Sequence, residues 1–267
     1  MTTLDLPATR TGGGLLPGPV RHSLSLAWRT LLRIRRTPEQ LLDVTLQPPI
    51  FIGLFVYVFG GAIAGTQHEY LQFVLPSLIV QTAVFATIAI GANLNDDIKN
   101  GVFDRFRSLP ISRSAPLVGA VLGDVIRYSI AILVTLGCGI ALGFRISTDP
   151  LQALAACLLV LGFSLSLCWV FIFIGMLVRE SGAVQGLGFL VLFPLTFGST
   201  TFVKAETLPS WLQAWVKVNP VTHLNEAVRG LMTGGAVAEP VLWSVGWATL
   251  FLVVFSPLAV TAYRRRA

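Results

Sequence analysis

The chain has 267 residues, of which 54% are hydrophobic and only 12% are charged. Soluble domains carry about twice this share of charged residues. A single soluble core could not bury so much apolar surface. The composition therefore excludes an ordinary soluble domain and indicates a polytopic membrane protein.

The net charge is +6. A basic chain can bind nucleic acid, but here the basic residues flank apolar segments, where Lys and Arg set the orientation in the membrane. We therefore expect membrane lipids as neighbours and no nucleic-acid partner. The three cysteines, Cys138, Cys157 and Cys168, lie inside apolar runs without a CxxC pattern. They are interpreted as small hydrophobic residues.

Residues 1–20 are rich in Gly, Pro and Thr and predict a disordered cytoplasmic tail. The next segment, residues 21–37, has five arginines and no acidic residue between Arg21 and Arg36. Apolar residues, Trp28 among them, recur on one helical face of this segment. The pattern predicts a basic amphipathic helix that lies in the headgroup plane of the membrane.

Six charge-poor windows reach the length of a transmembrane helix, which is about 20 residues. We predict an all-α fold with six spans, at about residues 46–65, 71–94, 117–143, 151–178, 182–202 and 240–262. Pro48 and Pro49 are expected to bend the first span or delay its start. With both termini in the cytoplasm, 15 of the 19 basic residues lie on the inner side. This excess follows the positive-inside rule and predicts cytoplasmic termini.

The predicted inner loop, residues 96–114, contains a short amphipathic segment. A helix starting at Val102 would have an apolar face and a charged face, and Pro110 would end it. The apolar face would carry Val102, Phe103, Phe106 and Leu109, and the charged face Asp104, Arg105 and Arg107. Such a helix either rests on the membrane surface or docks into a groove on a soluble partner.

Two stretches resemble the ABC-2-type transporter permeases. The run DDIKNGVFDRFRSLPISRSAPLVGAVLGDVIR, residues 96–127, is similar to the cytoplasmic loop and third-span start of that family. Within the family it resembles the daunorubicin-resistance-type drug-export branch. The run NPVTHLNEAVRGLMTGG, residues 219–235, resembles the stretch before the last span. The likeness extends from about Arg21 to Arg266, the ABC-2-type domain being placed at residues 21–267.

The resemblance implies a permease subunit in the bacterial cytoplasmic membrane that exports an amphipathic drug, antibiotic or lipid-like compound by alternating access. It would work with a second permease copy or paralogue and with two ATP-binding-cassette subunits. In such permeases a coupling helix touches the nucleotide-binding subunit. The residues here that match this loop are Gly101, Phe103, Asp104, Arg105, Phe106 and Arg107.

The chain lacks the nucleotide-binding loop that an ATPase needs. A Walker A loop places a lysine directly after a glycine, and none of the three lysines, Lys99, Lys204 and Lys217, follows one. We therefore expect a transporter subunit that is not itself an enzyme. ATP and Mg would bind to the partner chain, and this chain would hold no cofactor or metal.

The predicted outer loop, residues 204–237, is too long for a simple turn. Trp211 and Trp215 give a first short helix an aromatic face suited to the membrane interface. Asn219 and Pro220 then predict a capped helix start. Two interpretations remain: an amphipathic loop on the lipid surface or, as the resemblance implies, a re-entrant hairpin that shapes the outer gate.

Four charged residues inside apolar surroundings are predicted to pair. Glu226 and Arg229 are three residues apart in the second outer helix, and Asp124 and Arg127 have the same spacing near the inner end of the third span. Snorkelling and mutual pairing are the favoured interpretation of Asp124 and Arg127, with a proton relay as the alternative.

Two other function classes share single features with the sequence. Gly198-Ser199 and His223 suggest an intramembrane hydrolase with a Ser–His dyad, but the sequence has no GxSG and His223 falls in the outer loop. A channel or secondary transporter would need mid-membrane charges or inverted repeats, and the sequence shows neither. Gln47, Gln81 and Gln185 would either line a path or bridge helices.

Overall fold

The structure is a computed structural model that describes residues 39–61, 65–101 and 115–266. The predicted tail and interfacial helix, residues 1–37, lie outside these ranges. So do five coupling-loop residues: Phe103, Asp104, Arg105, Phe106 and Arg107. The described part of the chain forms helices and no strand, in agreement with the all-α prediction.

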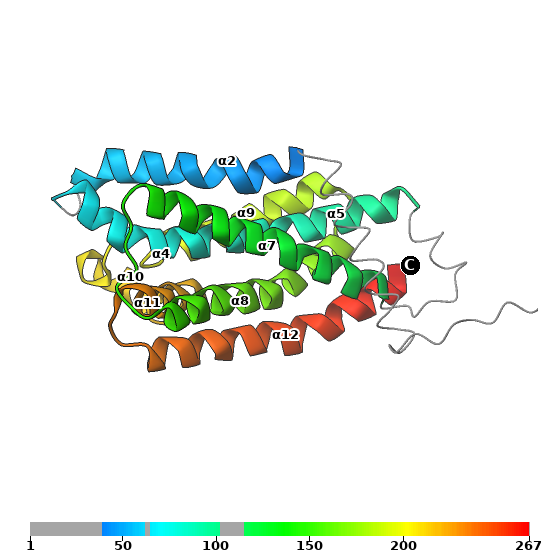
Figure 1. Cartoon of the computed structure of the whole chain (residues 1–267). Coiled ribbons are helices and arrows are strands. Elements are labelled where there is room, and N and C mark those ends of the chain that lie inside the picture. Colours follow the sequence, from blue (N-terminus) through cyan, green and yellow to red (C-terminus); the bar gives the residue numbers. More distant parts are fainter. Residues whose placement is uncertain (1–38, 62–64, 102–114, 267) are drawn as a thin grey trace, which may run out of the picture.

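The helices run lengthwise in one bundle (Figure 1). In chain order they are α2 (Glu39–Leu54), which continues into a π-helical turn (Phe55–Phe59), α4 (Gln67–Ala86), α5 (Ile88–Lys99), α7 (Ala115–Ala141), α8 (Pro150–Leu177), α9 (Ser181–Phe197), α10 (Ser210–Val216), α11 (Pro220–Thr233) and α12 (Ala238–Arg266). The short helices α10 and α11 lie at one end of the bundle, and the C-terminus lies at the other.

Four stretches are long and apolar enough to cross a membrane: Gln67–Lys99, Leu117–Ala141, Pro150–Leu177 and Ala238–Tyr263. They fall in the windows predicted for the second, third, fourth and sixth spans. Two shorter apolar helices, Thr45–Phe59 and Ser181–Phe197, fall in the first and fifth windows.

Three boundaries differ from the sequence prediction. Helix α2 runs through Pro48 and Pro49, so the prolines do not delay its start. The second window holds two helices, α4 and α5, joined at Thr87, whose hydroxyl donates to the Val84 carbonyl at 2.6 Å. Helix α9 ends at Phe197, five residues before the predicted end of the fifth span.

Helix α4 forms the centre of the bundle and contacts α2, α7, α8 and α11. Its buried side chains include Tyr70, Val74 and Leu75. Helices α9 and α12 instead expose large apolar residues, such as Leu190 at 70% and Leu242 at 72%. An exposed apolar surface of this kind is suited to contact with lipid rather than water.

Four hydroxyl groups on the long helices are satisfied locally. Each donates to the carbonyl oxygen four residues earlier, at 2.7–3.0 Å, in Ser129, Thr135, Ser166 and Thr249. Such bonds need no water and no partner helix. Polar residues therefore fit these apolar helices without breaking their backbone hydrogen bonds.

Candidate functional site

Helices α5 and α8 touch backbone to backbone at one pair of glycines. A Cβ added at Gly91 would lie 2.2 Å from the carbonyl oxygen of Phe171, and one added at Gly175 would lie 2.5 Å from the carbonyl oxygen of Gly91. Only glycine permits so close an approach, because side chains cannot be compressed to such distances. The contact fixes α5 against α8 near the end of the bundle that carries the loop 102–114.

Two side chains of α5 fasten the end of α8 and the start of α9. The Asn95 amide donates to the carbonyl oxygens of Gly175 at 2.9 Å and Val178 at 2.6 Å. These carbonyls lie at the C-terminal end of α8, where side chains often complete the hydrogen bonding of a helix. One turn later, Lys99 forms an ion pair with Glu180. We call Gly91, Asn95, Lys99 and their partners the inner anchor.

The chain leaves the inner anchor at Gly101. Its φ of +65° lies in the left-handed region, which glycine adopts without strain. The turn follows Lys99 directly, so the loop that matches the coupling segment begins at a fixed point of the bundle. The remaining residues of that prediction lie outside the described residues.

At the opposite end, Asn219 caps two helices at once. Its side-chain oxygen accepts from the Val221 amide at 2.9 Å at the start of α11. Its amide group donates to the carbonyl oxygens of Leu195 at 2.7 Å and Gly198 at 3.1 Å at the end of α9. Pro220 follows at the first helical position, where its missing N–H costs nothing. The predicted helix start is confirmed.

Arg229 connects α11 to α4 and to the turn after α9. Its guanidinium donates to the Phe73 carbonyl at 3.2 Å, the Ser77 hydroxyl at 2.8 Å and the Thr200 carbonyl at 2.9 Å. It also lies 3.9 Å from the centroid of the Phe73 ring. Burial lowers the pKa of Arg229 to about 10, against the opposing effect of Glu226, so the group stays charged at neutral pH.

Asn225 adds a second connection to the same turn. Its amide donates to the hydroxyl oxygens of Thr201 at 2.8 Å and Ser199 at 3.3 Å. The other end of α11 is held by Thr148, whose hydroxyl donates to the Leu231 carbonyl at 2.6 Å. We call α10, α11 and the turn 198–201 the outer cap. Side-chain hydrogen bonds hold it to α4, α9 and the α7–α8 loop.

The tryptophans of α10 lie at the surface of the outer cap. Trp211 is 72% exposed and Trp215 is 45% exposed. The indole of Trp215 lies over Gly198, where a Cβ would come within 3.0 Å of its ring nitrogen. Trp211 and Trp215 therefore give α10 an exposed aromatic face next to the end of α9.

The structure does not bring Glu226 and Arg229 into an ion pair. Among the described residues, the one ion pair within 4 Å is Lys99–Glu180, while the Arg229 donors go to α4 and Thr200. Burial raises the pKa of Glu226, and His223 and Arg229 partly oppose this rise. The spacing suggested Glu226 as the partner of Arg229. The fold instead supplies carbonyl and hydroxyl oxygens as acceptors for the guanidinium.

Asp124 and Arg127 are both buried on α7, at 6% and 7% exposure. Their side chains do not form the predicted ion pair in the described part of the chain. Asp124 instead accepts a hydrogen bond from the Tyr128 hydroxyl at 3.3 Å. The Arg127 Nε has no hydrogen-bond partner among the described residues.

The geometry speaks against a hydrolase dyad at Ser199 and His223. The Ser199 hydroxyl lies 2.6 Å from the Thr196 carbonyl, to which it donates, and Asn225 donates to it. His223 stacks on Trp243 with ring centroids 5.2 Å apart, and its Nε2 lies 3.0 Å from the Lys217 carbonyl. Each residue is thus engaged elsewhere, and neither is the other's hydrogen-bond partner.

Sequence reasoning missed Gly91, Asn95, Ser77 and Asn225. Gly91 and Asn95 lie four residues apart, next to the predicted inner loop, so a shared helical face could have indicated a contact. Their partners on α8 come 80 or more residues later, and no local pattern names them. Ser77 lies inside the apolar helix α4, and Asn225 lies beside the charged Glu226 on α11, so neither uncharged residue stands out in the sequence.

The comparisons with known proteins agree with this architecture. A family model described as ABC-2 type transporter matches residues 22–233. The chain is 41% identical over 251 residues to the daunorubicin resistance ABC transporter permease protein DrrB1 of Streptomyces coeruleorubidus, covering 92% of this chain and 87% of that protein. It is 28% identical over 213 residues to the doxorubicin resistance ABC transporter permease protein DrrB of Mycobacterium tuberculosis, covering 78% and 74%.

A more distant relative is ABC transporter G family member 20 of Dictyostelium discoideum, 25% identical over 243 residues, which are 89% of this chain but 30% of that protein. The family match covers most of the chain, and the first relative covers nearly all of it. The chain belongs to the ABC-2 type transporter family, as a membrane permease subunit and not as the ATPase.

Proposed function

We propose that this permease exports an amphipathic drug, antibiotic or lipid-like compound across the bacterial cytoplasmic membrane. It would act by alternating access with a second permease copy or paralogue, driven by two ATP-binding-cassette subunits. The observation that carries the proposal is the pair of fixed points at opposite ends of the bundle. The inner anchor lies where the coupling loop begins, and the outer cap lies at the other end.

A continuous path of contacts joins these two points. Helix α5 is fastened to α8 by Gly91, Gly175 and Asn95. Helix α8 packs against α12 and, farther along, against α11 of the outer cap. A displacement of the coupling loop would therefore move α5 and α8 together and reach α11 through packed helices. Such packed, rigid elements are suited to carry a movement between two sites.

The proposal includes six spans with both termini in the cytoplasm. Four helices have the length for this, and the two shorter ones, Thr45–Phe59 and Ser181–Phe197, lie alongside them. The 17 residues of α9 extend over about 25 Å, which is less than the thickness of a bilayer core of about 30 Å. The outer cap, joined to the end of α9 by Asn219, would fill the remaining depth from outside. This supports the re-entrant interpretation.

The proposed substrate class follows from the relatives and from the composition of the bundle. Two relatives are named for daunorubicin and doxorubicin resistance. The helices of the bundle are mainly apolar, so a transport pathway between them would suit the apolar part of such compounds. Daunorubicin is therefore the first substrate to test.

The coupling loop provides the test. Replacing Asp104 and Arg105 together by alanine is expected to leave the permease inserted in the membrane and to abolish export. The reason is that the loop would lose the charged contacts to the ATPase subunit that this proposal assigns to it. The measurement is ATP-dependent daunorubicin uptake into inverted membrane vesicles that contain the permease and its ATPase subunit, with permease abundance measured by immunoblot.

The matched control removes one arginine and one aspartate at the opposite end of the bundle. Arg145 is exposed, and Asp149 makes no side-chain cap to α8. The double variant Arg145→Ala and Asp149→Ala should export at the wild-type rate. Normal export by Asp104→Ala, Arg105→Ala would refute the role assigned to the coupling loop. Absence of ATP-dependent uptake by the wild-type complex would refute daunorubicin as substrate.

A further inference from the structure

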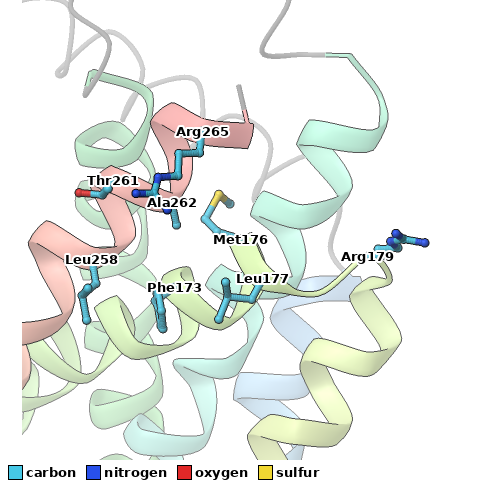
Figure 2. A pocket seen from close by; sticks show the side chains of 8 residues that line it. All are labelled: Phe173, Met176, Leu177, Arg179, Leu258, Thr261, Ala262 and Arg265. Atoms are coloured by element: carbon cyan, nitrogen blue, oxygen red, sulfur yellow. The ribbon is translucent and has the colours of Figure 1, made fainter.

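A cleft opens between α8 and α12 at the end of the bundle that holds the C-terminus (Figure 2). Its volume is about 610 Å³. Its walls are made by one face of each helix and by the α8–α9 connection. The lining residues are Phe173, Met176, Leu177, Arg179, Leu258, Thr261, Ala262 and Arg265.

The α12 side of the cleft changes from apolar to cationic along the helix. Leu258, Thr261, Ala262 and Arg265 recur at the spacing of a single helical face. Leu258 lies deepest, and Arg265 lies about 10 Å nearer to the helix end, because each helical residue adds about 1.5 Å. The side chain of Arg265 turns back along α12 towards Thr261 (Figure 2). The Thr261 hydroxyl already donates to the Pro257 carbonyl at 2.7 Å, so the donors at the mouth of the cleft are those of the Arg265 guanidinium.

The α8 side repeats this order. Phe173 and Leu177 form the apolar wall, and Arg179 follows on the connection to α9, at the rim of the cleft, with its guanidinium pointing outward (Figure 2). Phe173 is backed by Phe255 of α12, with ring centroids 6.0 Å apart. Both walls thus place apolar groups deep in the bundle and a guanidinium at its end.

The positive charge at the mouth has no acidic counterpart among the described lining residues. The nearest acid in sequence is Glu180, and its carboxylate is already paired with Lys99 of the inner anchor. Arg179 and Arg265 are exposed, so their charge is available to a ligand. Guanidinium groups bind phosphate with two parallel hydrogen bonds.

We propose that this cleft binds an anionic phospholipid of the cytoplasmic leaflet. The phosphate lies beside Arg265 at the mouth, one acyl chain lies along Phe173 and Leu258, and Arg179 adds positive charge at the far rim. The two guanidiniums repel a cationic amphiphile at this position, and the order of apolar and charged groups matches the depth profile of a lipid. The inference rests on the proposed function only for the assignment of this end to the cytoplasmic side.

The test is lipid binding to the purified full-length permease in detergent, counted as bound lipids by native mass spectrometry. Dioleoyl-phosphatidylglycerol and dioleoyl-phosphatidylcholine have the same chains, so their difference reports the headgroup charge. The wild-type protein is expected to bind phosphatidylglycerol more tightly. Equal binding of the two lipids would overturn the proposal without any variant.

Two variants separate the charge from the apolar wall. The double variant Arg179→Gln and Arg265→Gln should weaken phosphatidylglycerol binding about fivefold for each charge removed and leave phosphatidylcholine unchanged. Ala262→Trp keeps both arginines but fills the cleft, so it should also weaken phosphatidylglycerol binding. The control double variant Arg145→Gln and Lys217→Gln removes two exposed charges at the other end and should bind like the wild type.

Three results would contradict the proposal. If glycerol phosphate displaces the lipid at a concentration similar to that of the lipid itself, the mouth is an anion site and the apolar wall does not contribute to binding. If daunorubicin displaces it, the cleft is a substrate site. If Ala262→Trp binds normally, the lipid lies elsewhere. Binding is measured without the ATPase subunit, so failure here leaves the export proposal intact, and failure of export leaves this inference intact.

Discussion

Replacing Gly91 with alanine is expected to destabilise the permease and to stop export. The added Cβ would lie 2.2 Å from the Phe171 carbonyl oxygen and 2.8 Å from its carbon. These atoms belong to the backbone of α8, so no side chain can rotate away to make room. Helices α5 and α8 would have to separate, and forced overpacking of this kind costs about 1–3 kcal/mol.

Separation of these helices would also disturb Asn95, whose amide bonds to Gly175 and Val178 depend on the same approach. The measurements are the midpoint of thermal unfolding in detergent and ATP-dependent export in vesicles. Gly162→Ala is the matched control, because it lies on α8 with no atom within 4 Å of the added Cβ. If Gly91→Ala unfolds and exports like Gly162→Ala, the backbone contact does not hold the inner anchor.

Replacing Arg229 with methionine is expected to release the outer cap from α4. The change removes three hydrogen bonds and the contact with the Phe73 ring. It leaves the buried Ser77 hydroxyl without its donor. Each hydrogen bond from a charged group contributes about 1.5–3 kcal/mol, and the loss is smaller than their sum because they share one side chain.

The direct measurement is hydrogen–deuterium exchange of the α11 amides, which should become faster than in the wild type, together with loss of export. Arg229→Lys should restore only part of the protection, since an ammonium cannot reach three acceptors with the geometry of a guanidinium. Arg145→Met is the control for loss of an exposed arginine. Unchanged exchange in α11 of Arg229→Met would show that the outer cap is held without Arg229, by Asn219, Asn225 and Thr148.

The helices that can be predicted from the sequence are those whose ends are marked by neighbouring residues. Asn219 and Pro220 mark the start of α11, and Gly234, with φ of +94°, marks its end. Apolar length likewise reveals the four long helices, because a bilayer crossing requires a minimum number of residues. Such signals are local, so a single sequence contains them.

The contacts that hold the two ends of the bundle together are not local. Arg229 has Glu226 three residues away, but its Ser77 partner lies 152 residues earlier. The second span is predicted to end near residue 94, whereas α5 continues to Lys99, and the partner of Asn95 on α8 lies 80 residues later. The Gly91–Gly175 approach joins one glycine on each of two helices, and no spacing within either helix indicates that these two glycines meet. These pairings depend on tertiary packing, which composition and spacing do not encode.

The shared cap at Asn219 also has an electrostatic consequence. A helix carries about half a negative charge at its C-terminus and about half a positive charge at its N-terminus. Asn219 bonds to the end of α9 and the start of α11 with one side chain, so the two opposite partial charges lie next to each other. Their fields largely cancel, so the junction between these two helix ends needs no ion of its own, and Arg229 bonds only to the Thr200 carbonyl in the turn that follows α9.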